Sequence, residues 1–225
     1  RISCGMRATE GAIERVWIDD AAVTLQVIGG GMPIGVCGSG LLDAVAQMRR
    51  AGVLEESGRM LTPEKAAARL PDSLARRIVS VDNAEGFVLG HRGKRQVILT
   101  QRDVRELQLA KGAIRAGISI MLAEYGIGIE DITEVLLAGA FGSYISPASA
   151  RDIDLVPQLP IERITAVGNA AGLGSIMALL STDLREEASR IARTVHYLEL
   201  SARSDFMDQF MDAMSLNGVA QAVTA

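Results

Sequence analysis

Three glycine-containing segments are the parts of this sequence best suited to hold a ligand. Residues 37–40 read Cys-Gly-Ser-Gly, residues 139–142 read Gly-Ala-Phe-Gly, and residues 168–174 read Gly-Asn-Ala-Ala-Gly-Leu-Gly. Each follows a short apolar run typical of a buried strand. Glycine there lets backbone N–H groups approach a sugar or a phosphate. Each segment is therefore either a ligand loop or a tight structural turn.

The candidate ligand contacts lie at the turns themselves and are Gly38, Ser39, Gly40, Gly139, Ala140, Phe141, Gly142 and Asn169. At residues 139–142, spacing alone supports a ligand loop and a structural turn equally, because single glycine loops are weak indicators. At residues 170–175, close helix packing is the favoured interpretation. Residues 37–40 stand between a predicted strand and a predicted helix, where the helix dipole favours an anion.

Nucleophilic catalysis and metal binding are both disfavoured. The Cys-Gly-Ser-Gly segment departs from the Gly-x-Ser-x-Gly pattern because residue 37 is cysteine, and no acid partner is indicated for His91 or His196. Cys37 is expected to be a small buried residue beside a phosphate-facing turn. Two cysteines and two histidines share no ligand spacing, so no metal or iron–sulfur site is expected within this chain.

A long helix is predicted over residues 100–125, opened by Thr100 with Asp103 in a capping-box arrangement. Its expected buried face has the 3-4 spacing of Val104, Leu107, Ile114, Ile118, Met121 and Tyr125. A small-residue patch at residues 112–117 would let another backbone approach closely. Gln108, Lys111 and Arg115 form a polar stripe, which periodicity alone interprets as a solvated face.

The elements that must position these residues alternate between strand and helix. Strands are predicted at residues 12–18, 23–28, 33–36, 87–89, 96–99, 134–138, 163–167 and 195–200. Helices are predicted at 41–51, from 62, at 100–125, from 146, at 170–180, 182–194 and 205–214. This order predicts an α/β fold with one parallel-containing sheet flanked by helices.

Four sections follow from that order. Residues 1–54 and 101–216 would form the two parts of one ligand-binding lobe. Residues 55–100 interrupt the strand–helix rhythm and would form an inserted subdomain, with a hairpin around residues 90–93. Residues 217–225 are expected to be a disordered tail.

The composition limits which binding partners and which cellular compartment are expected. A net charge of −4 and a pI near 5.3, without a basic run, argue against a nucleic-acid surface. The uncharged residues 164–182 contain three glycines and an asparagine and fit a strand and a helix better than a membrane span. Two cysteines imply no disulfide framework, which predicts a cytoplasmic protein. The first residues show no targeting signal, and the chain is expected to be cut from a longer protein.

Five blocks together resemble one family, the ATP-dependent reductive activators of corrinoid (cobalamin-type) proteins. The blocks are residues 2–8 with 11–13, 37–43, 106–111 with 113–117, 137–142 with 144–145, and 167–172. The chain is similar to the C-terminal region of these proteins from its first residue to about Met214. They belong to the acetate and sugar kinase, heat-shock chaperone and actin superfamily.

The resemblance implies a fold and a set of roles. The fold would be an actin/sugar-kinase-like (ribonuclease H-like) lobe with a mixed sheet flanked by helices. Residues 139–142 would be the adenosine loop, and residues 168–174 would begin a hinge helix between lobes. Gln108 and Lys111 would face the adenine. The parent protein would use ATP and Mg²⁺ to restore Co(I) in a corrinoid-binding methyl-transfer protein, and monomer and homodimer both stay open.

The family's Asp-x-Gly-Thr phosphate loops and its cysteine clusters do not occur in these 225 residues. The resemblance therefore implies an iron–sulfur cluster elsewhere in the parent, and a chain that is inactive alone. Two alternatives stay open. One is another ATPase or kinase of the superfamily, such as an activator of an acyl-CoA dehydratase. The other is a non-catalytic docking module whose glycine turns are structural.

Overall fold

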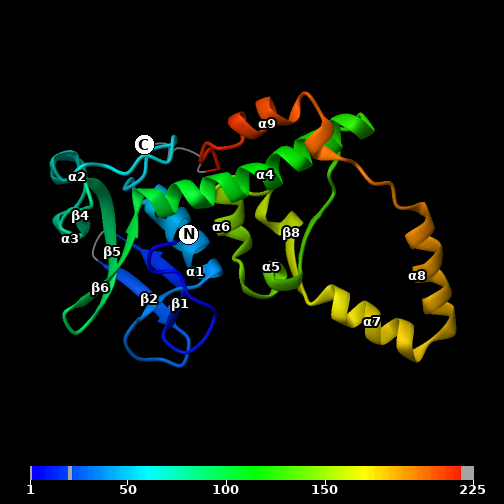
Figure 1. Cartoon of the computed structure of the whole chain (residues 1–225), viewed down its shortest axis with the longest axis horizontal. Helices are drawn as coiled ribbons and strands as arrows, with labels where there is room; N and C mark the ends of the chain where they lie inside the picture. Colours follow the sequence, from blue (N-terminus) through cyan, green and yellow to red (C-terminus); the bar gives the residue numbers. More distant parts are fainter. Residues whose placement is uncertain (1, 20–21, 219–225) are drawn as a thin grey trace.

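The computed structural model describes residues 2–19 and 22–218, and for residues 140–142 it describes the backbone only. Its strands are β1 (Ala12–Ile18), β2 (Val23–Val27), β3 (Gly35–Val36), β4 (Ile78–Val81), β5 (Ala84–Arg92), β6 (Arg95–Thr100), β7 (Val135–Ala138) and β8 (Ile164–Gly168). Its α-helices are α1 (Gly38–Arg50), α2 (Pro63–Arg69), α3 (Asp72–Ala75), α4 (Gln101–Tyr125), α5 (Gly139–Tyr144), α6 (Pro147–Asp152), α7 (Ala170–Leu180), α8 (Thr182–Thr194) and α9 (Phe206–Asp212) (Figure 1).

The described strands form three sheets, so the prediction of a single sheet is wrong. Their orders are β2-β1-β3, β4-β5-β6 and β7-β8. The two strands expected to share a sheet, β7 and β8, do pair in parallel. They stand apart from β1–β3 because α6 packs against both α1 and β8. Strand β3 has only two residues, which gives a further strand little to pair with.

The main core is built around α1, which packs against β1 (Figure 1). Buried side chains of α1, such as Leu42 and Met48, share one apolar cluster with Ile13 of β1. The buried Asp43 carboxylate accepts a hydrogen bond from the Val16 N–H (2.8 Å) and another from the Ser149 hydroxyl at α6. Burying this carboxylate is tolerated because both of its oxygens are hydrogen bonded.

The segment predicted as an insertion contains α2, α3 and β4–β6. The predicted hairpin is present as β5–β6, paired antiparallel. Phe87 and Leu99 of this hairpin lie in the same buried cluster as Met48. The three-stranded sheet therefore covers the core that α1 builds.

Helix α4 begins with the predicted capping box, in which Thr100 accepts from the Asp103 N–H and Asp103 accepts from the Thr100 N–H. It ends at Gly126, whose φ of +64° is left-handed and suits glycine. The predicted buried face is wrong beyond its first turns: Ile114, Met121 and Tyr125 are exposed, Tyr125 by 70%. In the C-terminal half of α4 the buried residues are Ala116, Gly117 and Ile120, so the helix turns a different face inward from the one predicted.

The small-residue patch of α4 is confirmed as a place of close approach. Helix α9 packs along α4, and a Cβ at Gly112 would lie 3.4 Å from both Phe210 and Met214. The residues after α9 then enter the core, where Leu216 is fully buried. Of the predicted tail, Asn217 and Gly218 are described, and residues 219–225 lie outside the described residues.

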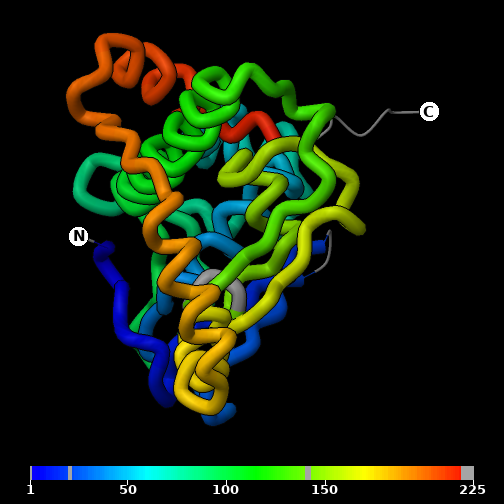
Figure 2. Tube along the Cα trace, turned by 90° about the vertical axis from the view of Figure 1, so that its right-hand side faces the viewer, coloured from blue at the N-terminus to red at the C-terminus, as the bar shows by residue number. Residues whose placement is uncertain are grey.

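Helices α7 and α8 form one end of the molecule (Figure 1), and this end faces the viewer in Figure 2. The strand predicted at residues 195–200 is wrong, because residues 195–199 are irregular and Leu200–Ala202 is a 3₁₀ turn. Val195 and Tyr197 are exposed, and no described strand lies in position to pair with them. In the part of the chain that the structure describes, no helix combines the length and the apolar character that a membrane crossing requires.

Candidate functional site

Two of the predicted ligand segments lie side by side at one end of the β7–β8 pair. Ala138 is paired with Gly168, so Gly139 and Asn169 follow neighbouring strands at the same sheet edge. Gly139 (φ +69°) and Gly168 (φ +64°) are left-handed, and an added Cβ at either would meet no atom within 4 Å. The backbone there is open to a ligand.

Residues 139–142 form the first turn of α5 and not a free loop. The predicted adenosine-facing roles of Ala140, Phe141 and Gly142 depend on atoms outside the described side chains and stay predictions. Asn169 already has a structural role, because its Oδ1 caps α7 by accepting from the Gly172 N–H at 3.0 Å. Its amide nitrogen is the atom that a ligand would meet.

The third segment, residues 37–40, forms the N-terminus of α1. Cys37 is buried as expected, and its thiol donates to the Ile13 carbonyl (3.2 Å) and makes no capping hydrogen bond to the helix. The first N–H groups of a helix have no partner inside it, and they carry the positive end of the helix dipole. Gly38 is open, since an added Cβ would meet nothing within 4 Å.

Gly40 is different, although it belongs to the same motif. A Cβ there would lie 2.1 Å from the Ile13 carbonyl oxygen and 2.8 Å from its carbon. The glycine is thus required for α1 to cross β1 closely. Close packing against β1 is therefore enough to explain a glycine at position 40, without a ligand contact.

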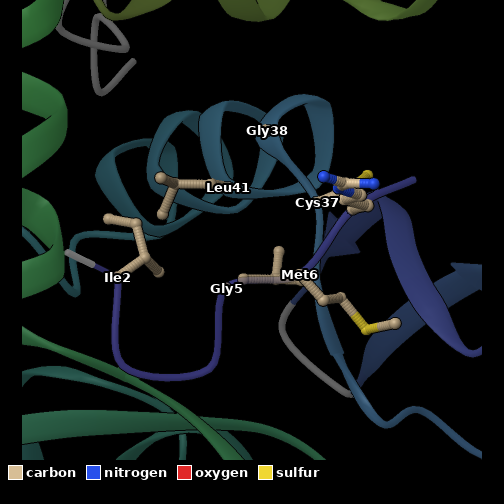
Figure 3. A pocket seen from close by; sticks show the side chains of 8 residues that line it. Ile2, Gly5, Met6, Cys37, Gly38 and Leu41 are labelled. Carbon is tan, nitrogen blue, oxygen red and sulfur yellow. The ribbon is translucent and has the colours of Figure 1, made fainter. Parts of the chain in front are cut away.

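Two cavities border the N-terminus of α1. The first, here called the front cavity, has a volume of about 440 Å³ and is lined by Ile2, Gly5, Met6, Arg7, Val36, Cys37, Gly38 and Leu41. Figure 3 shows Ile2 and Leu41 on one side of it and Met6 and Cys37 on the other. The chain before β1 reaches this position because Gly5 bridges to Val36 of β3.

The second, here called the helix cavity, has a volume of about 420 Å³, within the range of small-molecule sites. It shares Met6, Arg7, Cys37 and Gly38 with the front cavity, and its other lining residues are Ala8, Ser39, Leu42, Leu107, Ala110, Lys111, Ile114, Tyr144, Ile145 and Leu155. The walls are mainly apolar, with Arg7, Ser39 and Lys111 as the polar groups. Such a cavity suits a flat, weakly polar ring attached to an anionic group.

Lys111 lines the helix cavity but its ammonium is already engaged. Nζ donates to the Ser215 carbonyl and lies 3.7 Å from the Asp154 carboxylate. The residue is 1% exposed, so the interpretation of the stripe as a solvated face is wrong. Burial lowers the pKa of Lys111 to about 8, against the opposing effect of Asp154.

Gln108 is also 1% exposed and does not line the helix cavity. Its amide nitrogen donates to the carbonyls of Ser57 (3.0 Å) and Met214 (2.8 Å). Both polar residues therefore hold the chain segment after α9 against α4. An adenine-facing role is compatible with the position of Lys111, whereas Gln108 faces the turn at residues 57–60.

The structure thus groups Gly38, Ser39 and Lys111 at one cavity and Gly139 and Asn169 at the β7–β8 edge. Helix α5 connects the two places, since it begins at Gly139 and ends at Tyr144, which lines the helix cavity. The predicted contacts did not include four residues that line the helix cavity, namely Arg7, Tyr144, Ile145 and Leu155. The only signal for Arg7 was its place in a family-like block, and the others are apolar or aromatic residues without a distinctive pattern.

The shifted pKa of Lys111 predicts how the stability of the chain depends on pH. The folded pKa (about 8) lies below the ordinary value of 10.5, so the folded chain binds fewer protons between these values. Stability should therefore rise with pH across this window. Between pH 7 and 9.5 we expect wild type to gain about 2 kcal/mol relative to Lys111→Met in urea unfolding. Lys65→Met changes an exposed lysine and keeps Lys111, so its stability should rise with pH as that of wild type does. Equal slopes for all three proteins would contradict a desolvated Lys111.

Two parallel strands end in glycine turns that begin two helices, and one of these helices leads to a cavity with apolar walls. This arrangement places the protein in the actin-like class of α/β domains. The chain belongs to the family described as the C-terminal domain of RACo, the ASKHA domain, which matches residues 1–223.

Its relatives have consistent names. The chain is 35% identical over 214 residues to the corrinoid activation enzyme RamQ of Eubacterium limosum, covering 93% of this chain and 36% of that protein. It is 23% identical over 184 residues to a [Co(II) methylated amine-specific corrinoid protein] reductase of Methanosarcina barkeri, covering 81% and 29%. A solved structure, a reductive activator for corrinoid, iron–sulfur protein, is 38% identical with a TM-score of 0.81, covering 95% and 34%. The chain thus spans about a third of the length of these relatives.

Proposed function

We propose that this chain is the C-terminal, nucleotide-binding region of an ATP-dependent activator that returns an inactive Co(II) corrinoid to Co(I). The observation that carries the proposal is the helix cavity, which joins an open helix N-terminus at Gly38 and Ser39 to apolar walls and Lys111. The names of the similar proteins support the corrinoid as the target. The partner would be a corrinoid-binding methyl-transfer protein in the cytoplasm.

The residues of this chain would contribute binding and not the chemical step. The first N–H groups of α1 and the Arg7 side chain would hold phosphate oxygens at the junction of the two cavities. Leu107 and Ile114 would contact the base, with Lys111 at its edge. Gly139–Gly142 and Asn169 remain the proposed adenosine contacts at the opposite end of α5.

The donor set does not suit a metal or a cluster. Among the described residues, no group of three or more His, Cys, Asp or Glu side chains is placed to hold a metal ion. Magnesium bound to the phosphates, and the iron–sulfur cluster that carries the electron, are therefore proposed for the remaining part of the longer protein.

Coupling would be conformational. One electron from an external reductant reduces Co(II) to Co(I), while ATP and water become ADP and phosphate. No atom is shared between the two reactions, so ATP can drive electron transfer only by favouring one arrangement of the two proteins. The α5 and α7 N-termini, which meet at the β7–β8 edge, are suited to sense the nucleotide.

The first test is Gly38→Asp. A carboxylate at the first position of α1 favours the helix dipole and has open space, so the fold should be kept. The same carboxylate would repel a phosphate at that position. We expect at least a tenfold loss of ATP affinity, measured by isothermal titration calorimetry. The protein titrated would join residues 1–225 to the preceding region of the 38% identical activator.

The matched control is Ala188→Asp, which adds the same charge on the exposed face of α8. Its ATP affinity should equal that of wild type. Unchanged ATP affinity in Gly38→Asp would show that the phosphate does not bind at the α1 N-terminus. Absence of nucleotide binding in wild type would instead favour the docking-module alternative.

A further inference from the structure

The tip of the β5–β6 hairpin is an exposed cluster of positive charge. Residues 91–96 are all exposed, and they include Arg92, Lys94 and Arg95. This concentration is unusual in a chain whose net charge is −4. Figure 1 shows the hairpin extending away from the helices at the end of the molecule opposite α7 and α8.

The strand register increases the electrostatic cost of this cluster. Arg92 lies directly opposite Arg95 in the antiparallel ladder, and like charges in that position destabilise a sheet. Within residues 2–19 and 22–218, none of the three basic side chains forms an ion pair. Among the described residues, β4 pairs only with residues 84–87 of β5, so Arg92 and Arg95 both lie on strand segments whose outer side has no strand partner.

The hairpin packs against β2 and Pro33 two residues before Arg92. A Cβ at Gly90 would lie 2.9 Å from Leu25 of β2 and 2.9 Å from Pro33. Two residues after Pro33, Gly35 begins β3, where a Cβ would lie 3.0 Å from the Met6 sulfur. Met6 lines both cavities. The backbone near the hairpin tip and the backbone beside Met6 are therefore both packed against residues 33–35 or belong to them.

We infer that Arg92, Lys94 and Arg95 form a docking site for an acidic surface of the corrinoid-binding partner protein, an inference that rests on the proposed function. Three charges on a small tip suit a protein surface. Anionic lipid recognition commonly uses clusters of four to eight basic residues, and the negative charge of the rest of this chain would repel a nucleic acid. Opposite charge at the rim of an interface mainly accelerates association.

The test neutralises the tip with Arg92→Gln, Lys94→Gln and Arg95→Gln together. The matched control, Lys65→Gln with Arg69→Gln and Arg193→Gln, removes the same charge from exposed positions on α2 and α8. Association of the 225-residue chain with a corrinoid iron–sulfur protein and with a methylated-amine corrinoid protein is measured by biolayer interferometry. At 20 mM salt we expect the tip variant to associate about tenfold more slowly than wild type and the control, with the difference largely lost at 0.5 M salt.

The outcomes separate the two proposals. Equal association rates for wild type and the tip variant would overturn the docking site and leave the proposed function intact. Failure of wild type to bind either corrinoid protein would overturn the proposed function and this inference with it. Wild-type binding to a 20-base-pair duplex DNA that is lost in the tip variant, without loss on the corrinoid protein, would reassign the tip to nucleic acid. The melting temperature of the tip variant should equal or exceed that of wild type, because the Arg92–Arg95 repulsion is gone.

Discussion

Gly40→Ala is expected to lower the free energy of unfolding by at least about 3 kcal/mol, whereas Gly38→Ala should change it by less than about 1 kcal/mol. The two glycines are two residues apart in one motif, yet only Gly40 faces the backbone of β1. A methyl group there would lie 2.1 Å from the Ile13 carbonyl oxygen, and Ile13 is completely buried. Backbone in the core cannot move away cheaply, so α1 would have to shift from the sheet that it covers.

Urea unfolding followed by circular dichroism measures both variants. A destabilisation of this size can remove the folded baseline of Gly40→Ala, so the soluble yield and the melting temperature of each variant are compared as well. Gly38→Ala provides the control, because it makes the same chemical change in open space one half-turn away. Equal stability of the two variants would show that α1 does not need its close approach to β1. Gly40 would then again be a candidate ligand contact.

The same pair of residues shows what the sequence could and could not predict. The strand–glycine–helix pattern located the α1 N-terminus, and the Thr100–Asp103 capping box located the start of α4. Both are local features in which neighbouring residues determine the structure. Which glycine meets the ligand and which meets β1 depends on how closely α1 crosses the strand, and that distance is not encoded in local spacing.

The polar stripe of α4 could not be interpreted locally for a similar reason. Gln108 and Lys111 are buried because the carbonyls of Met214 and Ser215 accept their hydrogen bonds. These acceptors come from a segment about a hundred residues further along the chain. Without that segment, a glutamine and a lysine at 3-4 spacing resemble an exposed face. The division into three sheets has the same origin, since the position of α6 between α1 and β8 is a tertiary packing effect.

Helix α7 shows a conflict between sequence and structure that points beyond this chain. It is rich in apolar residues but none of them is buried, and Leu179 and Leu180 are 74% and 80% exposed. Leu136 and Val167 on the β7–β8 pair are exposed as well. Exposed apolar side chains in this number on one helix mark an interaction site. Because the chain spans about a third of its relatives, we propose that the remaining part of the longer protein covers α7.

The joined protein, in which residues 1–225 follow the preceding region of the 38% identical activator, is therefore expected to hydrolyse ATP at least about a thousandfold faster than the 225-residue chain alone. Phosphoryl transfer depends on positioning and on charge stabilisation around the phosphates. This chain offers one helix N-terminus and Arg7 for that purpose, and no carboxylate group among its described residues is arranged to hold Mg²⁺. Turnover is measured as phosphate release with the corrinoid partner present, and hydrogen exchange in α7 is measured in both proteins.

Exchange in α7 should slow markedly in the joined protein, because its apolar side chains become buried against the added region. Leu179→Glu with Leu180→Glu should abolish both the protection of α7 and the gain in turnover, while Glu186→Gln on α8 should leave both unchanged. Comparable turnover by the chain alone and by the joined protein would mean that the catalytic groups lie within residues 1–225. Faster turnover without protection of α7 would mean that the added region supplies the phosphate ligands from another surface, and the proposal that it covers α7 would then be wrong.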